Sequence, residues 1–238
     1  MDYFKRTELL IGEDNFKKIE NSSVAVFGIG GVGGFVCEAL ARSGVKNITI
    51  IDNDAVSITN INRQIIANVY TIGKRKVDVM EERLKSINPT INVRKKQTFF
   101  LPDTSCEIDF TGFDYIVDAV DTVSAKIEII KKAKESGVPV ISCMGTGGKI
   151  DPTKLKVVDI EKTKVCPLAR VMRRELKNRD ITGVKVVYSD EEPLFLGNKK
   201  DGEIIKKNRI APPSMIFVPA TAGIIIAQEI VKDIINKG

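Results

Sequence analysis

The chain has 238 residues, of which 43% are hydrophobic and 29% are charged, and its formal net charge is +6. This balance is typical of a globular protein with one large domain or two small ones, and it excludes a disordered or fibrous chain. Histidine is absent and the four cysteines form no CxxC pair, so imidazole catalysis is excluded and neither a disulfide framework nor a zinc site is indicated.

The first 22 residues predict an N-terminal arm or helix. They contain no apolar stretch of signal-peptide length. The most apolar window, residues 215–231, is interrupted by Pro219, Gln228 and Glu229 and is shorter than the about 20 residues that span a bilayer. We therefore expect a cytoplasmic protein without a membrane span.

Strands and helices alternate from residue 24 onward. The apolar run 24–28, a helix at 31–43 and a strand at 48–52 predict one βαβ unit. The pattern then predicts a helix, two strands, a helix and a strand at residues 74–86, 92–96, 115–120, 125–136 and 138–143. Such alternation predicts a mostly parallel sheet in an α/β, Rossmann-like fold.

The pattern changes after residue 145. We expect two strands, a basic helix between them, a polar loop and a last apolar helix at residues 155–160, 184–188, 168–178, 199–209 and 220–235. There is no internal repeat or low-complexity segment. The simplest division is one structural domain, in which residues 146–238 form a C-terminal extension packed on the same core as residues 23–145.

A glycine-rich turn follows the first predicted strand. Gly28, Gly30 and Gly33 form GxGxxG between a strand and a helix, and Gly31 adds a further glycine. A backbone without Cβ atoms lets phosphate oxygens approach the amides of a helix N-terminus. Asp52 ends the next strand, where a carboxylate commonly binds ribose hydroxyls. Residues 23–145 are therefore predicted to bind an adenine nucleotide.

The segment DNDAVSITNINRQ at 52–64, followed by GKRK at 73–76, favours ATP over a dinucleotide. Hydride transfer has no need of Asn60, Arg63 and Lys76 beside the phosphates. A reaction of ATP does need such residues, because Arg63 can pair bidentately with phosphate oxygens and Lys76 can place a point charge on them as the α-phosphorus is attacked. We also count Gln64 among the nucleotide-binding candidates. A polar loop without a ligand is the alternative.

Two acids end the predicted strand at 115–120, in the segment VDAVDT. An apolar strand would place Asp118 and Asp121 at the carboxyl edge of the sheet, where ligands bind in open α/β folds. Mg²⁺ sites usually use one or two carboxylates together with phosphate oxygens. We expect Asp118 to be a structural cap and Asp121 to face the ligand.

Three segments, GIGGVG, IDNDAVSITNINRQ and DAVDT, resemble the ubiquitin-activating-enzyme-like adenylyltransferase superfamily over residues 24–143. The resemblance implies an enzyme that adenylates a carboxylate with ATP and releases pyrophosphate. It implies that Asp121 lies near Mg²⁺ and the reacting carboxylate, and that the ribose and phosphates are bound by Asp52 and by Asn60, Arg63 and Lys76. It further implies a homodimer in which Arg6 reaches the nucleotide phosphates of the partner, the alternative being an ordinary surface arginine.

The remaining segments resemble the tRNA threonylcarbamoyladenosine dehydratase branch, and the two CxxC pairs usual in sulfur-carrier activators are missing. The segments are GGKIDPTKLKVVDIEKT, PLARVMRREL, VVYSDEEP and PPSMIFVPATAG. The resemblance implies that the threonyl carboxylate of the modified adenosine in tRNA is adenylated, and that a ureido nitrogen of the same base then closes a hydantoin ring and expels AMP. Because both groups belong to one substrate, the second step needs no protein nucleophile.

A basic excess lies in the predicted substrate-binding extension. Residues 161–209 contain 13 Lys or Arg against 8 Asp or Glu. The helical period puts four cations on one side of the predicted basic helix, which we expect to contact tRNA: Arg170, Arg173, Arg174 and Lys177. An ordinary solvated helix face is the alternative.

Cys166 precedes Pro167 at the start of the basic helix, a position at which thiols are often activated. We expect an unreactive Cys166. A reactive one would favour the alternative function, an adenylyltransferase that activates the C-terminal glycine of a ubiquitin-like sulfur-carrier protein. A third alternative is a Rossmann module that binds NAD(P) or senses a nucleotide. The sequence leaves open whether a sulfur-transfer protein is a further partner.

Overall fold

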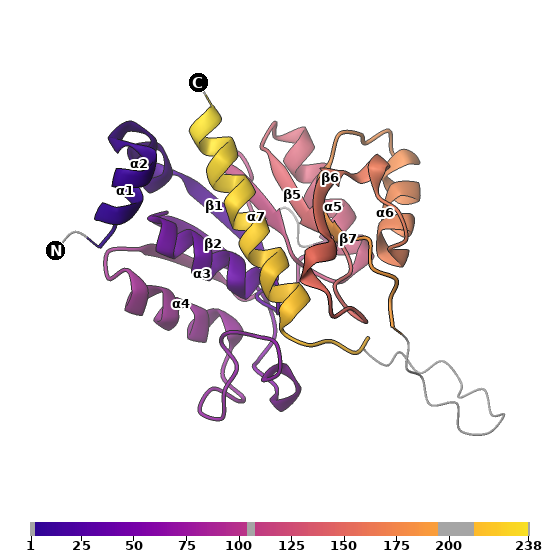
Figure 1. Cartoon of the computed structure of the whole chain (residues 1–238), viewed down its shortest axis with the longest axis horizontal. Coiled ribbons are helices and arrows are strands. Elements are labelled where there is room, and N and C mark those ends of the chain that lie inside the picture. The colour runs from indigo at the N-terminus through magenta and orange to yellow at the C-terminus, as the bar shows by residue number, and fades with distance from the viewer. Residues whose placement is uncertain (1–2, 104–107, 195–211, 238) are drawn as a thin grey trace.

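The computed structural model describes residues 3–103, 108–194 and 212–237, and a seven-stranded sheet forms its centre (Figure 1). The strand order is β3-β2-β1-β4-β5-β7-β6, and every neighbouring pair is parallel except β7 and β6. The strands are β1 (Ser23–Phe27), β2 (Asn47–Ile51), β3 (Asn92–Lys96), β4 (Tyr115–Asp118), β5 (Val140–Cys143), β6 (Leu155–Asp159) and β7 (Lys185–Ser189).

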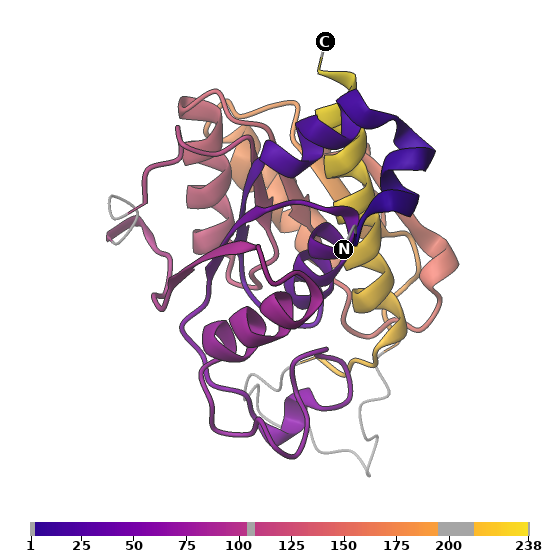
Figure 2. The same ribbon diagram turned by 90° about the vertical axis from the view of Figure 1, so that its left-hand side faces the viewer.

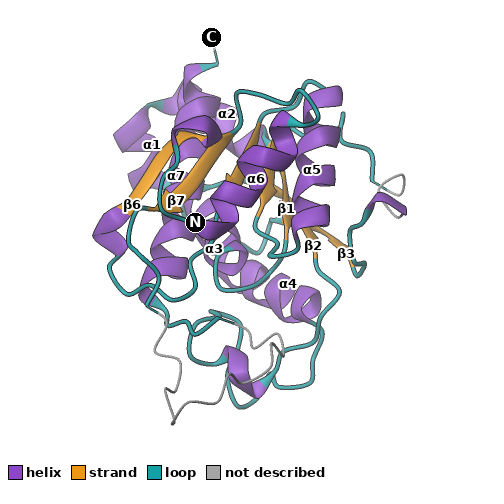
Figure 3. Cartoon of the chain, turned by 90° about the vertical axis from the view of Figure 1, so that its right-hand side faces the viewer, coloured by secondary structure: helices purple, strands orange, loops and turns teal. Residues whose placement is uncertain are grey.

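Helices cover both faces of this sheet (Figures 1 and 3). One face carries α3, α4 and α7, and the other carries α5 and α6. The α-helices are α1 (Lys5–Ile11), α2 (Glu13–Asn21), α3 (Gly33–Ser43), α4 (Lys76–Ile87), α5 (Val123–Glu135), α6 (Pro167–Lys177) and α7 (Phe217–Asn236). The predicted α/β, Rossmann-like fold class is confirmed.

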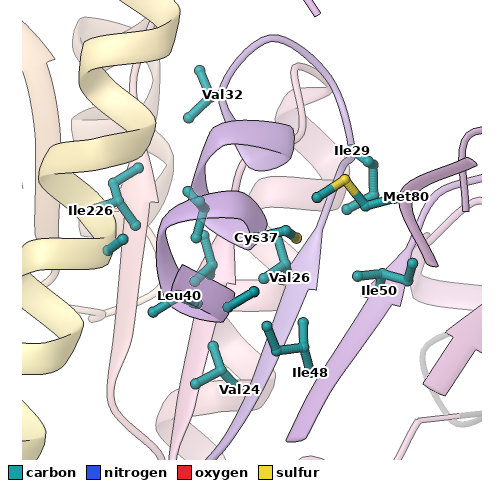
Figure 4. Packing of buried hydrophobic residues seen from close by; sticks show 14 of the residues in the cluster. Val24, Val26, Ile29, Val32, Cys37, Leu40, Ile48, Ile50, Met80 and Ile226 are labelled. Carbon is teal, nitrogen blue, oxygen red and sulfur yellow. The ribbon is translucent and has the colours of Figure 1, made fainter. Parts of the chain in front are cut away.

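Alternate residues of each central strand enter two separate hydrophobic cores. Val24 and Val26 of β1 pack toward α3 and α7, whereas Ala25 and Phe27 pack toward α5. Figure 4 shows Val24 and Val26 of β1 close to Leu40 of α3, in the same hydrophobic cluster. Because strands covered on both faces bury every residue, they read as continuous apolar runs rather than as alternating ones.

The last helix packs on the first core, as the sequence predicted for residues 220–235. Helix α7 crosses α3 closely at Gly223, where a Cβ atom would lie 2.5 Å from the carbonyl oxygen of Val32. Only glycine permits this approach. At its other end α7 reaches α2, where Lys18 Nζ donates to the carbonyl oxygen of Ile235 at 3.2 Å (Figure 2).

The extension contributes two strands to the same sheet. Strand β7 pairs in parallel with β5, and β6 returns antiparallel along the outer edge of β7. The hydropathy pattern located both strands but contained nothing about their direction. The polar loop predicted at 199–209 lies outside the described residues. Within the described ranges, none of the helices is both long and apolar enough to cross a bilayer.

Candidate functional site

A pocket of about 940 Å³ opens at the carboxyl ends of β1, β2, β4 and β5. Its walls are the loops that follow these strands, including Gly28, Asp52, Asp121 and Met144. The chain leaves β1 toward β2 on one side and reaches β4 on the other, so the pocket lies where the strand order reverses. Open α/β sheets bind their ligands at this point.

The four predicted glycines divide into two pairs. A Cβ at Gly28, where φ is +88°, would lie 2.8 Å from the carbonyl oxygen of Ala119, and a Cβ at Gly33 would lie 1.8 Å from that of Gly28. These two glycines are required to close the turn. A Cβ at Gly30 or Gly31 would meet no atom within 3.3 Å, and both residues line the pocket, whereas Gly33 does not. Gly30 and Gly31 therefore leave space in the pocket beside the turn.

Asp52 braces the glycine turn against the next loop. Its Oδ2 accepts a hydrogen bond from the amide of Ile29 at 2.7 Å and its Oδ1 accepts one from the amide of Asp54 at 2.8 Å. Burial raises the pKa of Asp52 above its ordinary value, although Lys76 and these two amides act in the opposite direction. The carboxylate lines the pocket, with lone pairs left for a ligand hydroxyl.

Lys76 and Arg63 bring positive charge to the same wall. Lys76 is the first residue of α4 and is 6% exposed, and its Nζ lies 2.7 Å from Asp54 Oδ2 and 3.7 Å from Asp52 Oδ1. Arg63 Nη1 donates to the carbonyl oxygen of Thr59 at 2.8 Å and to Asn62 Oδ1 at 3.0 Å. Both cations line the same pocket as the glycine turn.

Two amide side chains complete this wall. Asn60 ends a short 3₁₀ helix, η1 (Ile58–Asn60), and its Oδ1 accepts from the amide of Ser57 at 3.0 Å, which orients the side chain in the pocket. Gln64 is buried, and its Oε1 has no hydrogen-bond partner among the residues that the structure describes. A buried acceptor without a partner is costly, so a ligand donor would stabilise this position.

Asp118 and Asp121 differ sharply in environment. Asp118 is 0% exposed, and its carboxylate accepts hydrogen bonds from Val120, Lys126 and Ser142, as expected of a structural cap. Asp121 is exposed on the pocket wall. No cluster of three or more acidic or thiol ligands occurs in the described parts of the chain. One carboxylate with phosphate oxygens is a usual Mg²⁺ arrangement, so Asp121 fits a magnesium ion that arrives with a nucleotide.

Other predicted residues lie away from the pocket. Arg6 is exposed on α1, and α2 enters β1 at the amino-terminal edge of the sheet, opposite the pocket. Helix α6 contacts the pocket only through Leu168 near its start. The four predicted tRNA-contact residues, Arg170, Arg173, Arg174 and Lys177, belong to α6 but do not line the pocket.

Cys166 is 2% exposed and packs in the second hydrophobic core. It is the N-cap residue of α6, with Pro167 at the first helical position as predicted. A Cβ placed on the pocket residue Gly145 would lie 3.5 Å from its Sγ, so the thiol lies behind the pocket wall rather than on it.

Sequence reasoning missed two further walls of the pocket. Thr98, Phe99 and Phe100 follow β3 at the same edge of the sheet, and that position alone could have identified them. Pro212 and Pro219 approach from the C-terminal segment, and no local pattern indicated that they would.

The fold and this site define a nucleotide-binding α/β protein, because a glycine turn, a ribose-type carboxylate and two cations meet at the switch point of a parallel sheet. The chain belongs to the ThiF family, whose model matches residues 4–238. It is 41% identical to a tRNA threonylcarbamoyladenosine dehydratase of Bacillus subtilis (strain 168), over 98% of this chain and 94% of that protein.

The chain is also similar to solved structures of a tRNA N6-threonylcarbamoyladenosine dehydratase. The crystal structure of Escherichia coli tRNA N6-threonylcarbamoyladenosine dehydratase, TcdA, in complex with ATP matches with a TM-score of 0.89 and 34% identity, over 99% of this chain and 95% of that one. The structure of the same protein in complex with AMP matches with a TM-score of 0.90 and 33% identity, with the same coverage.

Proposed function

We propose that the protein is an ATP-dependent tRNA threonylcarbamoyladenosine dehydratase. The observation that carries the proposal is the match over 99% of the chain to a dehydratase crystallised with ATP, in a fold whose pocket gathers Asp52, Arg63, Lys76 and Asp121. The proposed substrate is the threonylcarbamoyl adenosine of a tRNA. The product is its cyclic hydantoin form, with AMP and pyrophosphate released.

Seven of the pocket residues are proposed to bind ATP. Gly30 and Gly31 leave room for the phosphates, and Asp52 accepts hydrogen bonds from the ribose hydroxyls. The buried Oε1 of Gln64 lacks a donor in the described structure, and a nucleotide hydroxyl or amino group would supply one. The phosphates are proposed to be bound by Asn60, Arg63 and Lys76.

Adenylation needs charge neutralisation at the α-phosphorus. An oxygen of the threonyl carboxylate attacks this phosphorus, and the bond to pyrophosphate breaks. Arg63 and Lys76 stabilise the negative charge that develops on the phosphate oxygens, and for this Lys76 must exchange its contact with Asp54. Asp121 would hold Mg²⁺, which neutralises further charge on the phosphates when bound.

Ring closure follows on the same substrate. The ureido nitrogen attacks the activated carbonyl carbon, loses its proton and displaces AMP, so the nucleoside loses one water overall. The chain contributes by holding both groups close together and requires no covalent intermediate. This suits a pocket whose lining thiol, Cys143, is 4% exposed and has its pKa raised by burial, while the thiol of Cys166 lies behind the wall.

A homodimer is part of the proposal, because Arg6 lies on α1, away from the pocket of its own chain, and does not line it. Leu9 and Leu10 on the same helix are 74% and 84% exposed, as expected of a helix that contacts a partner. In the proposed dimer, Arg6 reaches the β- and γ-phosphates of ATP bound to the partner.

One assay tests the function. The protein is mixed with ATP, Mg²⁺ and tRNA carrying threonylcarbamoyladenosine, and pyrophosphate exchange is followed together with the mass of the nucleoside. Loss of one water from the nucleoside is expected. Exchange that appears only with a carrier protein ending in Gly-Gly would contradict the dehydratase and support the sulfur-carrier activator.

Cys166→Ser is expected to retain most of the dehydratase activity, because Cys166 is buried and forms no part of the pocket surface. The rate of nucleoside dehydration is measured for the variant and for the parent protein at equal folded concentration. A variant that is folded and inactive would contradict the proposed mechanism, which uses no protein thiol.

The exposed cations of α6 are expected to bind the tRNA phosphates. Arg173 is different from the others, since its guanidinium donates to the carbonyl oxygen of Thr163 at 2.7 Å and is thereby fixed within the protein. Replacing Arg170, Arg174 and Lys177 with alanine should lower the slope of log affinity for tRNA against log salt by about 3.

Filter binding at several salt concentrations checks this expectation. The matched control replaces three lysines outside α6, Lys17, Lys46 and Lys85, and should leave the slope unchanged. Equal slopes for the two triple variants would show that α6 presents only a solvated face. Arg173→Ala should instead lower the melting temperature.

A further inference from the structure

A fully buried lysine lies next to the pocket wall that carries Asp121. Lys126 belongs to the first turns of α5 and is 0% exposed. Its Nζ donates to Asp118 Oδ1 at 3.1 Å and to the carbonyl oxygen of Val120 at 3.1 Å, and it lies 3.0 Å from Asp118 Oδ2. No motif found in the sequence includes Lys126.

The carboxylate of Asp118 is held from two other directions. Ser142, its partner in the register of β4 and β5, donates through Oγ to Oδ2 at 2.5 Å. The amide of Val120 donates to Oδ1 at 3.3 Å. All three side chains, Asp118, Lys126 and Ser142, are 0% exposed, so they form one buried polar cluster that joins β4, β5 and α5.

Stability alone does not account for this cluster. Removing two charges from water is costly, and replacing a buried ion pair with apolar residues of similar volume is often neutral or stabilising. What the cluster does fix is the backbone of residues 118–120, because two of the three oxygens near Lys126 Nζ belong to Asp118 and the third to Val120.

The opposite side of the same segment rests on the glycine turn. The amide of Ala119 donates to the carbonyl oxygen of Phe27 at 2.9 Å, and the carbonyl oxygen of Ala119 occupies the space that a side chain at Gly28 would need. Residues 118–120 are therefore clamped between the turn and Lys126. Asp121 is the next residue along the chain.

We propose that Lys126 is a positioning residue for adenylate formation, which sets the backbone before Asp121 so that this carboxylate faces the bound phosphates and their metal ion. The proposal rests on the proposed function. Groups that orient metal ligands from behind typically change metal affinity or activity by 10- to 100-fold when they are removed.

The test variant is Lys126→Met combined with Asp118→Asn, so that no unpaired charge stays buried. We expect kcat for ATP–pyrophosphate exchange to fall about 100-fold and the Mg²⁺ concentration for half-maximal rate to rise about 10-fold. The Kd for ATP without Mg²⁺ should stay unchanged, because the hydrogen bonds and the ion pair of Lys126 are formed with Asp118 and Val120 and not with Asp52, Arg63 or Lys76.

Ile129→Ala is the matched control. Ile129 is 0% exposed on the same helix and belongs to the second hydrophobic core, so its truncation destabilises that core and leaves the side chains of Asp118, Lys126 and Ser142 unchanged. Hydrogen–deuterium exchange of the amides at 119–122, measured without nucleotide, should accelerate in the test variant and not in the control. The amide readout does not depend on enzymatic activity. A wild-type protein without ATP–pyrophosphate exchange would therefore contradict the proposed function, while amide exchange would still test the positioning proposal.

Ser142→Ala decides the matter if the double variant fails to fold. It keeps both charges and removes one hydrogen bond to Asp118, and it should raise the Mg²⁺ requirement about 10-fold. An unchanged Mg²⁺ requirement in Ser142→Ala would overturn the proposal. So would a double variant that matches Ile129→Ala in kcat, Mg²⁺ requirement and amide exchange at equal folded concentration.

Discussion

Asp121→Asn is expected to lower the rate of ATP–pyrophosphate exchange about 1,000-fold. Asp121 is the exposed carboxylate that follows β4, and a neutral amide in its place would no longer offset the charge of the proposed Mg²⁺. Loss of several kcal/mol of charge stabilisation in a transition state corresponds to about three orders of magnitude in rate. Exchange of labelled pyrophosphate into ATP measures this loss.

The same substitution should barely change the melting temperature. Within the described structure, Asp121 accepts one long hydrogen bond, from Thr122 Oγ1 at 3.4 Å, so little native stabilisation is lost. Asp14→Asn is the control, since Asp14 is exposed on α2, away from the pocket, and its loss should leave the rate unchanged. A folded Asp121→Asn protein with wild-type exchange would remove Asp121 from the proposed mechanism.

The contrast between Asp121 and Lys126 shows what the sequence could predict. Asp121 could be predicted as a site residue because it follows an apolar strand within a short motif, and the glycine turn and Asp52 could be predicted for the same reason. Lys126 and Ser142 meet Asp118 only because β5 pairs with β4 and α5 folds back over them. A local sequence pattern contains no information about side-chain contacts of this kind.

The same distinction applies to the fold. Strands and helices were predicted close to their observed ends because apolar periodicity is local. The direction of β6 depends on its pairing with β7, and the approach of Pro212 and Pro219 to the pocket depends on where α7 docks against α3. These features follow from long-range packing, so only the structure reveals them.

Gly33→Ala is expected to destabilise the whole protein. The added Cβ would lie 1.8 Å from the carbonyl oxygen of Gly28, which is backbone and cannot rotate away, so the turn between β1 and α3 must open. Overpacking of this kind costs about 3 kcal/mol or more, which corresponds to a fall of roughly 10 °C in melting temperature for a chain of this size. Thermal and urea unfolding measure the loss.

Gly30→Ala distinguishes the glycines that close the turn from those that leave room for the phosphates. Its Cβ would meet nothing closer than Gln64 Nε2 at 3.9 Å, so we expect wild-type unfolding together with weaker binding of ATP, because the methyl group occupies the space in the pocket beside the turn. If Gly33→Ala unfolded like the wild type, the turn would have to differ from the one described. If Gly30→Ala bound ATP normally, the phosphates would have to lie elsewhere in the pocket.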